Sequence, residues 1–288
     1  MSNIEILDNC LGTKCSLCAR YCPANVFLVD KIKDFINVEN IDRCINCGHC
    51  MAICPTKALK HRFFEDLETN MLSKISPDQL IIFFEGRRSI RAYKKDPVSD
   101  FQKELLLRAI SSAPTATNRR NMEVLLLENH KVEQLTEWTI SAYERLIKKY
   151  NNPFISLSAR LLRQKKIYVQ FKKNLPFLES MIHFWRDKRE DKIFYHAPLV
   201  LILHGPPGLF SEADANLATQ QLLLMAHSLG LGSCWIGFFI VISKRDKKIK
   251  KYLNIPKNDK FFTAVAVGHP AVKFQRTIQR PRISTKQI

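Results

Sequence analysis

Long apolar runs are missing from this 288-residue sequence, and glycine and acidic residues are scarce in it. The longest apolar stretches lie near Leu199–Leu203 and Phe238–Ile242, far short of the roughly 18 residues that a membrane span needs. The first residues do not combine a basic segment with an apolar one, which argues against a secretory signal. We therefore expect a soluble, cytoplasmic protein that does not associate with membranes.

The shortage of glycine also limits the nucleotide-binding motifs that the chain could carry. Only nine glycines occur, and three of them lie in the segment Gly230-Leu231-Gly232-Ser233-Cys234-Trp235-Ile236-Gly237. A dinucleotide-binding fingerprint has its glycines spaced GxGxxG, follows a strand and opens a helix. Here the third glycine comes too late and a predicted helix precedes the segment. No Walker loop is present either, so a Rossmann domain is not supported.

Cysteine is almost absent from residues 55–288, where Cys234 alone occurs, whereas eight cysteines fall within residues 10–54. This shift in composition predicts a small cysteine-built domain over residues 1–66, a linker over 67–78 and a conventional domain over 79–288. Cys234 lies in an apolar context. We expect it to be a small, buried core residue, since free cysteine is among the most buried residue types.

The eight clustered cysteines form two runs, Cys10-x4-Cys15-x2-Cys18-x3-Cys22-Pro23 and Cys44-x2-Cys47-x2-Cys50-x3-Cys54-Pro55. A disulfide framework suits a secreted protein, which nothing in the sequence indicates. Zinc sites usually take their ligands from two well-separated pairs. Three closely spaced cysteines and a fourth followed by proline favour a [4Fe-4S] cluster instead, with zinc as the remaining alternative.

In two-cluster proteins of this kind, the fourth cysteine of each run binds the other cluster. The two expected ligand sets are Cys10, Cys15, Cys18 and Cys54 for one cluster and Cys44, Cys47, Cys50 and Cys22 for the other. Over about residues 1–62 the sequence resembles the bacterial two-cluster ferredoxins, except that x4 replaces x2 after Cys10. His49 lies between cluster ligands; we expect it on a solvent-facing loop, with a hydrogen bond that tunes the cluster as the alternative.

The charge of the chain is distributed as unevenly as its cysteines. Lys and Arg number 45 against 27 Asp and Glu, a formal net charge of +18, yet residues 1–66 hold eight basic and eight acidic residues. The whole excess therefore lies in residues 67–288, with dense basic runs at 155–174 and 244–251. Such runs suit nucleic acid, but no helix-turn-helix or RNA-binding signature accompanies them. An acidic electron-donor protein, a ferredoxin or a flavodoxin, is the favoured partner.

In the larger part of the chain, predicted helices alternate with few strands. Helix-start motifs occur at Ser99-x-x-Gln102, Ser211-x-x-Asp214 and Ser243-x-x-Asp246, and the first two helices are expected to end near Pro114 and Gly230. Residues 131–150 and 155–174 also have helical patterns. Strands are predicted at 122–127, 199–204 and 262–267. The expected class is α+β, with a helix-rich domain around one central sheet after the small iron–sulfur domain.

Four segments of this domain carry groups that could hold an anionic cofactor. Arg87-Arg88-Ser89-Ile90-Arg91 places three guanidinium groups and a hydroxyl within five residues, which suits a phosphate and a polar ring edge. The turn at 113–118, the glycine-containing segment 229–237 and the basic pair near the C-terminus follow in that order. Each segment alone also fits an ordinary charge cluster, turn or tail, so the combination carries the hypothesis.

In this order the four segments resemble those of the FMN-dependent nitroreductase family, over about residues 79–288. The resemblance implies FMN contacts from Arg87, Arg88, Ser89, Arg91, Pro114, Thr115, Ala116, Asn118, Ile236, Gly237, Arg280 and Arg282. It also implies a homodimer with two FMN sites at the subunit interface, and NAD(P)H as the usual donor. Family members often have Gln-Pro-Trp where this chain has Arg120-Asn121-Met122, which bears on substrate preference.

The two parts together predict an FMN-dependent oxidoreductase of nitroreductase type. Electrons would pass from a donor, either NAD(P)H or a reduced ferredoxin or flavodoxin, through two [4Fe-4S] clusters to FMN. They would then reach a small electron-poor acceptor such as a nitroaromatic or a quinone. The flavin carries this chemistry, so no catalytic side chain is expected. Two alternatives remain open, namely an adaptor that relays electrons to a protein partner and a basic nucleic-acid-binding protein with structural clusters.

Overall fold

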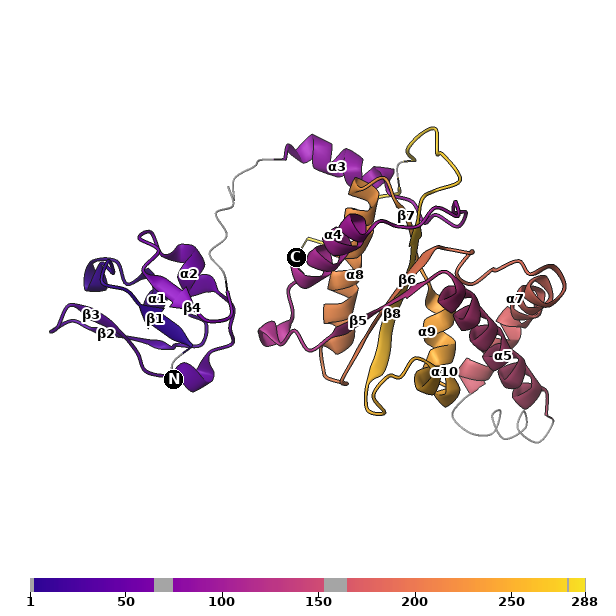
Figure 1. Cartoon of the computed structure of the whole chain (residues 1–288), viewed down its shortest axis with the longest axis horizontal. Helices are drawn as coiled ribbons and strands as arrows, with labels where there is room; N and C mark the ends of the chain where they lie inside the picture. The colour runs from indigo at the N-terminus through magenta and orange to yellow at the C-terminus, as the bar shows by residue number, and fades with distance from the viewer. Residues whose placement is uncertain (1–2, 65–74, 153–164, 279, 288) are drawn as a thin grey trace. The chain divides into compact units, whose positions relative to one another are not determined.

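The computed structural model describes residues 3–64, 75–152, 165–278 and 280–287 (Figure 1). The chain forms two compact units: residues 1–74 with the loop 115–119 make up the first, and residues 75–114 and 120–288 the second. Most of the predicted linker, 67–78, lies outside the described residues, so the exact domain boundary stays a prediction.

The first unit is built from two antiparallel strand pairs and two short helices. Strand β1 (Ile4–Ile6) pairs with β4 (Leu59–His61), and β2 (Phe27–Asp30) pairs with β3 (Phe35–Val38). The remaining elements are α1 (Leu17–Arg20), α2 (His49–Ile53) and the 3-10 turns η1 (Gly12–Lys14) and η2 (Ile41–Arg43). The apolar core is small, and most of the eight cysteines pack in or against it. A domain with so little core usually needs disulfides or a metal to be stable.

The second unit is organised by one antiparallel sheet of four strands in the order β5-β6-β8-β7. The strands are β5 (Glu123–Glu128), β6 (Leu199–Gly205), β7 (Gly232–Trp235) and β8 (Lys260–Gly268). Every residue of β6 is buried. This explains the unbroken apolar run Leu199–Leu203, since a strand covered on both faces needs no polar alternation. The buried His204 that follows it pairs with the Asp259 carboxylate at 2.9 Å.

Helices cover both faces of this sheet, and alternate residues of the central strands divide between two cores (Figure 1). Leu199, Leu201 and Leu203 pack on one side with helices α4 and α8, whereas Val200 and Ile202 pack on the other with α5, α7, α9 and α10. The helices are α3 (Pro77–Gly86), α4 (Asp100–Ser111), α5 (His130–Asn151), α7 (Lys165–Lys188), α8 (Ser211–Ser228), α9 (Gly237–Ser243) and α10 (Lys247–Tyr252). In the described part of the chain, no helix has the length and apolar character that crossing a bilayer requires.

The helix starts predicted at Ser99 and Ser211 are confirmed, although the Ser211 hydroxyl does not cap its helix, and the start predicted at Ser243 is wrong. The Ser99 hydroxyl accepts from the Gln102 N–H and the Gln102 side chain reaches back to the Ser99 N–H, a complete capping box. Ser211 instead donates to the Pro206 carbonyl from within the first turn of α8. The cap predicted at Ser243 is wrong, because α10 starts at Lys247 and Asp246 accepts from the Lys248 N–H. The side chain that caps a helix is the one that lies close to a free N–H of the first turn, and the motif alone does not determine which one that is.

Three helices and strands of the second unit, α3, β7 and α9, were missed, and part of one predicted helix lies outside the described residues. Helix α3 begins with a capping box between Ser76 and Gln79 and has Pro77 in its first turn, a signal that the sequence carries openly. Strand β7 has no alternation and is only four residues long, so its pattern matched a turn. Residues 155–164 of the helix predicted over 155–174 lie outside the described residues, and the rest belongs to α7.

Gly232 is required where the chain segment after α3 lies against β7. The Ile90 N–H donates to the Ser233 carbonyl at 3.0 Å, and a Cβ atom on Gly232 would lie 2.7 Å from the Ile90 side chain. We expect Gly232→Ala to lower the free energy of unfolding by about 1–3 kcal/mol, the usual cost of overpacking. Gly86→Ala is a matched control, because its Cβ would meet only the end of the His227 side chain at 3.2 Å.

Denaturant unfolding followed by tryptophan fluorescence measures this effect, since Trp138, Trp185 and Trp235 all belong to the second unit. If Gly232→Ala unfolds at the same denaturant concentration as Gly86→Ala, the close packing of Ile90 on β7 does not stabilise the unit.

Candidate functional site

Four of the predicted cluster ligands line one cavity of the first unit. Cys10, Cys15, Cys18 and Cys54 surround it, together with the backbone of η1 and the start of α1. Cys18 is buried and the other three are half-buried. Cys10 lines the cavity together with the other three cysteines, although four residues, not two, separate it from Cys15. The longer loop is accommodated by η1, in which Gly12 has a positive φ of 57°.

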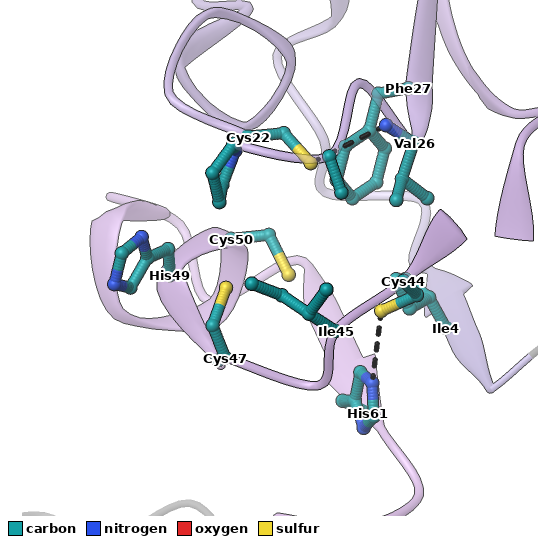
Figure 2. Close-up of a pocket in the computed structure, with 13 residues that line it drawn as sticks. Ile4, Cys22, Val26, Phe27, Cys44, Ile45, Cys47, His49, Cys50 and His61 are labelled. Carbon is teal, nitrogen blue, oxygen red and sulfur yellow. Dashed lines mark hydrogen bonds between the residues drawn. The ribbon is translucent and has the colours of Figure 1, made fainter. Parts of the chain in front are cut away.

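The other four predicted ligands line a second cavity (Figure 2). Cys44 follows η2, Cys47 and Cys50 lie before and within α2, and Cys22 comes from the opposite run. The sulfur atoms of Cys22, Cys44, Cys47 and Cys50 face the space between the segments that carry them. The structure therefore divides the eight cysteines into the same two sets of four that the sequence predicts, and the ligand role itself stays a prediction.

The arrangement of the sulfur atoms around these cavities indicates which metal centre they could hold. Zinc requires four ligands that converge on one ion, with each sulfur about 2.3 Å from it. Among the residues that the structure describes, no three His, Cys, Asp or Glu side chains converge in that way. Eight thiols spread around two cavities suit a cluster of several atoms better than a single ion. The zinc alternative is thus disfavoured by the arrangement of the sulfurs.

Hydrogen bonds and burial set the chemistry of the thiols. The Val26 N–H donates to Cys22 Sγ at 3.4 Å and the Ala58 N–H donates to Cys54 Sγ at 3.2 Å, so backbone N–H groups reach sulfur atoms in both cavities. Burial raises the pKa of the Cys18 and Cys50 thiols to about 11. Without a bound cation these two groups stay protonated at neutral pH, so metal binding must release their protons.

Two histidines lie near the second cavity in different ways. His49 is exposed, as predicted, and its ring points away from the sulfur atoms (Figure 2). His61 is only 3% exposed, and its Nε2 lies 3.9 Å from Cys44 Sγ. Burial, with a smaller contribution from Arg62, lowers the pKa of His61. The histidine beside the cysteines is therefore His61, which sequence spacing could not identify because it follows Cys44 by 17 residues.

In the second unit, the structure brings together arginines from opposite ends of the domain. Burial and the neighbouring Arg280 and Arg88 guanidinium groups lower the pKa of Arg87. Neither Arg87 nor Arg280 forms an ion pair with a carboxylate of the described residues. Arg88 donates to the Glu85 carbonyl at 2.6 Å and to the Ile278 carbonyl at 3.4 Å, which ties the C-terminal segment to the end of α3.

Such a group of cations without an acidic partner stabilises a bound anion. Two neighbouring guanidinium groups repel each other, and one phosphate can accept short charge-assisted hydrogen bonds from both. The predicted phosphate-binding residues Arg87 and Arg280 thus fit an anionic ligand. Arg282 is exposed, and Ser89 forms an isolated bridge with Ser233 of β7.

A cavity of about 620 Å³ lies next to β7 and the start of α9. Its volume is in the range of small-molecule and cofactor sites. The predicted residues Arg91, Ile236 and Gly237 line it. Its walls also include the aromatic residues Tyr195, Trp235, Phe238 and Phe262 and the polar residues Glu212, Asn216 and Lys244. Apolar walls with a few charged groups suit a flat, partly polar ring system.

Sequence patterns missed Tyr195, because a tight turn and not a motif brings it to this cavity. Tyr195 and His196 have positive φ values of 60° and 52°. The buried Asp191 carboxylate holds the turn by accepting from the backbone N–H groups of Ile193, Phe194 and His196 at 2.8–3.2 Å. Left-handed backbone at two successive residues is costly and persists only where the surroundings enforce it.

Cys234 lines the same cavity and is also part of the core, with 2% of its surface exposed. Burial raises the pKa of its thiol. The prediction that Cys234 is a core residue is confirmed, and a buried protonated thiol is a poor nucleophile.

The predicted loop residues Pro114, Thr115, Ala116 and Asn118 do not line this cavity. Residues 116–118 form a 3-10 turn in which Thr117 and Asn118 have positive φ values of 52° and 51°. The loop 115–119 groups with the first unit, where Asn118 donates to the carbonyls of Ile45 and Asn46 at 3.1 and 2.5 Å. The FMN contacts expected from these four residues stay a prediction.

Comparison with known proteins assigns a family model to each part of the chain. Residues 84–269 match the model of the nitroreductase family, and residues 9–59 match the model of the 4Fe-4S dicluster domain. A putative NADH dehydrogenase/NAD(P)H nitroreductase of Archaeoglobus fulgidus is 26% identical over 184 residues, which are 64% of this chain and 81% of that protein. A protein named Ferredoxin 7Fe from Hydrogenibacillus schlegelii is 36% identical over 59 residues, 20% of this chain and 72% of its own.

Among solved structures, a nitroreductase with bound FMN from Bacteroides fragilis superposes with a TM-score of 0.55 and 22% sequence identity. The match covers 73% of this chain and 99% of that chain. At this level of identity the likeness is one of fold.

Proposed function

Since this chain belongs to the nitroreductase family, we propose that it passes electrons from a donor through two [4Fe-4S] clusters to FMN and on to an electron-poor acceptor such as a nitroaromatic or a quinone. The chain is an oxidoreductase of this family with a 4Fe-4S ferredoxin domain. One observation carries the finer proposal: a single chain joins two four-cysteine cavities to a domain whose fold is that of an FMN-bound nitroreductase. Iron–sulfur clusters transfer electrons one at a time, and a flavin accepts one electron or two, so the clusters could supply the flavin with electrons.

In this proposal the two cysteine sets act as cluster ligands, four to each cavity. The observation that supports it is the donor set: four thiols surround each of two cavities, and in each cavity a backbone N–H is directed at a sulfur. Backbone N–H groups of this kind stabilise thiolate ligands and influence the potential of a cluster. Ligands that work as thiolates also require a reducing compartment, consistent with the expected cytoplasmic location.

FMN in this proposal is held by the second unit. Arg87 and Arg280, with Arg88 and Arg282 near them in sequence, would bind the phosphate, because their charges have no acidic partner in the described structure. Arg91 would face the ring from the wall of the 620 Å³ cavity, and Ile236 and Gly237 would lie along the ring. A cation at a flavin edge stabilises the negative charge that reduction places on the ring.

A second copy of the chain completes the site in this proposal. Pro114, Thr115, Ala116 and Asn118 would contact the FMN that the partner subunit holds at a shared interface. Helix α3 has no buried residue and exposes Ile81 and Ile82, a surface that a partner would cover. Sedimentation of the FMN-loaded protein should give twice the 33.4 kDa chain mass, and a monomer at micromolar concentration would contradict the shared site.

The electron donor can be identified by experiment, because NAD(P)H and reduced ferredoxin or flavodoxin can each be tested for turnover. NAD(P)H appears in the name of the Archaeoglobus fulgidus relative, and the net charge of +18 suits an acidic ferredoxin or flavodoxin. We expect reduced ferredoxin to drive turnover of a nitroaromatic or a quinone, with donor and acceptor reacting in alternation. Anaerobic steady-state kinetics with each donor and each acceptor measure this. Fast reduction of the protein without turnover of either small molecule would overturn the proposal in favour of an electron-transfer adaptor.

A further inference from the structure

His61 lies against one of the two four-cysteine cavities, with only 3% of its surface exposed. It ends strand β4, and its pairing with Ile4 of β1 fixes the backbone from which the ring projects. The side chain lines the cavity of Cys22, Cys44, Cys47 and Cys50, and its Nε2 lies 3.9 Å from Cys44 Sγ (Figure 2). The rings of Phe63 and Phe64, with centroids 5.6 and 5.0 Å away, pack around the imidazole.

A backbone hydrogen bond determines which ring nitrogen carries the proton. The Phe63 N–H donates to His61 Nδ1 at 3.3 Å, so Nδ1 uses its lone pair and cannot hold a hydrogen in the same direction. The hydrogen of the neutral ring is therefore on Nε2, the atom that faces Cys44 Sγ. The other near neighbour of that sulfur, Asn46 Oδ1 at 3.7 Å, is an acceptor and has no hydrogen to offer a thiolate.

The two cavities differ in the side chains that lie close to their cysteine sulfur atoms. Backbone N–H groups are directed at sulfur atoms in both, for example from Val26 to Cys22 in one and from Ala58 to Cys54 in the other. In the cavity with Cys54, the Thr56 hydroxyl lies 3.7 Å from that sulfur, and none of the described residues that line the cavity is a histidine. The cavity with Cys44 adds a buried imidazole, whose position is held by the strand, the Phe63 N–H and two aromatic rings.

We propose that His61 is a positioning residue that donates an N–H···S hydrogen bond to the Cys44 thiolate and thereby raises the reduction potential of the cluster held by Cys22, Cys44, Cys47 and Cys50. One-electron reduction adds negative charge to the cluster and its thiolates, so a hydrogen-bond donor aimed at a ligand sulfur stabilises the reduced form more than the oxidised form. This inference rests on the cluster ligands proposed above. It makes the two clusters unequal, because a buried imidazole donates to a ligand of one cluster and no histidine lines the described part of the other cavity.

The test is an anaerobic redox titration of the full chain, followed by EPR and visible spectroscopy. His61→Leu removes the donor and keeps an apolar side chain of similar size in the buried site. We expect one of the two cluster potentials to become more negative, enough to change the oxidised-to-reduced ratio at a fixed potential by up to about tenfold, which is about 59 mV for one electron. The other potential should not move, and His49→Leu, the exposed histidine between the ligands, should change neither.

A second measurement does not depend on how the variant folds. With histidine labelled by ¹⁵N, pulsed EPR of the reduced wild-type protein should show coupling between a cluster and a histidine nitrogen. The coupling should persist in His49→Leu and disappear in His61→Gln. Iron and sulfide content of every variant shows whether the clusters are present.

The outcomes separate this inference from the function on which it rests. A wild-type chain that holds no iron and sulfide would overturn both. Clusters that are present with no histidine coupling, or with potentials that do not respond to His61→Leu, would overturn the role of His61 alone. An equal shift of both potentials would also contradict it, since a single hydrogen bond at Cys44 acts on the nearer cluster.

Discussion

Removing one predicted ligand from each cavity, in the double variant Cys18→Ala and Cys47→Ala, is expected to abolish flavin reduction by reduced ferredoxin. Each substitution deletes one of four thiolates around a cavity, and a cluster with a missing ligand is labile. We expect iron and sulfide to fall well below the roughly eight of each that two intact clusters would supply. The FMN content should not change, because no cysteine of the first unit contributes to the cavity beside β7.

The control for this variant is Cys234→Ala, which removes the one cysteine outside both sets. Its thiol is buried in the core of the second unit, so its loss should leave iron and sulfide content as in the wild type. Because Cys234 also lines the cavity beside β7, it serves as the control for metal content alone. Anaerobic stopped-flow mixing with reduced ferredoxin compares the rate of flavin bleaching in the double variant with that in the wild type. If the double variant bleaches its flavin as fast as the wild type, electrons do not pass through the clusters.

Replacing Arg87 with glutamine is expected to weaken FMN binding by roughly 10- to 100-fold, the equivalent of about 1.5–3 kcal/mol for a hydrogen bond to a charged group. Arg87 is half-buried beside Arg280 and forms no ion pair with a described carboxylate. The same variant should be no less stable than the wild type when both are free of FMN, because it relieves repulsion between like charges. Loss of affinity without loss of stability distinguishes a binding role from a structural one.

Arg108→Gln is the matched control, since Arg108 is an exposed arginine on α4 of the same unit. Fluorescence titration of the FMN-free proteins gives the affinities, and thermal unfolding of the same samples gives the stabilities. Wild-type affinity in Arg87→Gln would remove Arg87 from the phosphate site. A large loss of stability in the FMN-free variant would assign it a structural role instead.

Short-range patterns predicted much of this molecule. The cysteine spacing predicts the same two sets of four that line the two cavities, and their role as ligands stays a prediction. The runs 199–204 and 262–267 correspond to β6 and β8, which are mostly apolar because both of their faces are buried, with His204 and Thr263 as buried polar exceptions. The capping box at Ser99 is equally local, and the same motif at Ser76 would have revealed α3.

Features that depend on distant segments could not be predicted in this way. Strand β7 exists because β8 pairs with it and Ile90 packs on Gly232, not because of its own four residues. Tyr195 reaches its cavity through a turn organised by a buried carboxylate. His61 approaches Cys44 because β4 pairs with β1, and the nearer histidine in sequence, His49, faces solvent.

The central claim is that one chain holds both two iron–sulfur clusters and a flavin. Its most direct test is the iron, sulfide and flavin content of anaerobically purified protein, measured together with the visible spectrum. The account predicts about eight irons, eight sulfides and one FMN per chain. Zinc in place of iron, or iron without any flavin after FMN has been supplied, would contradict it.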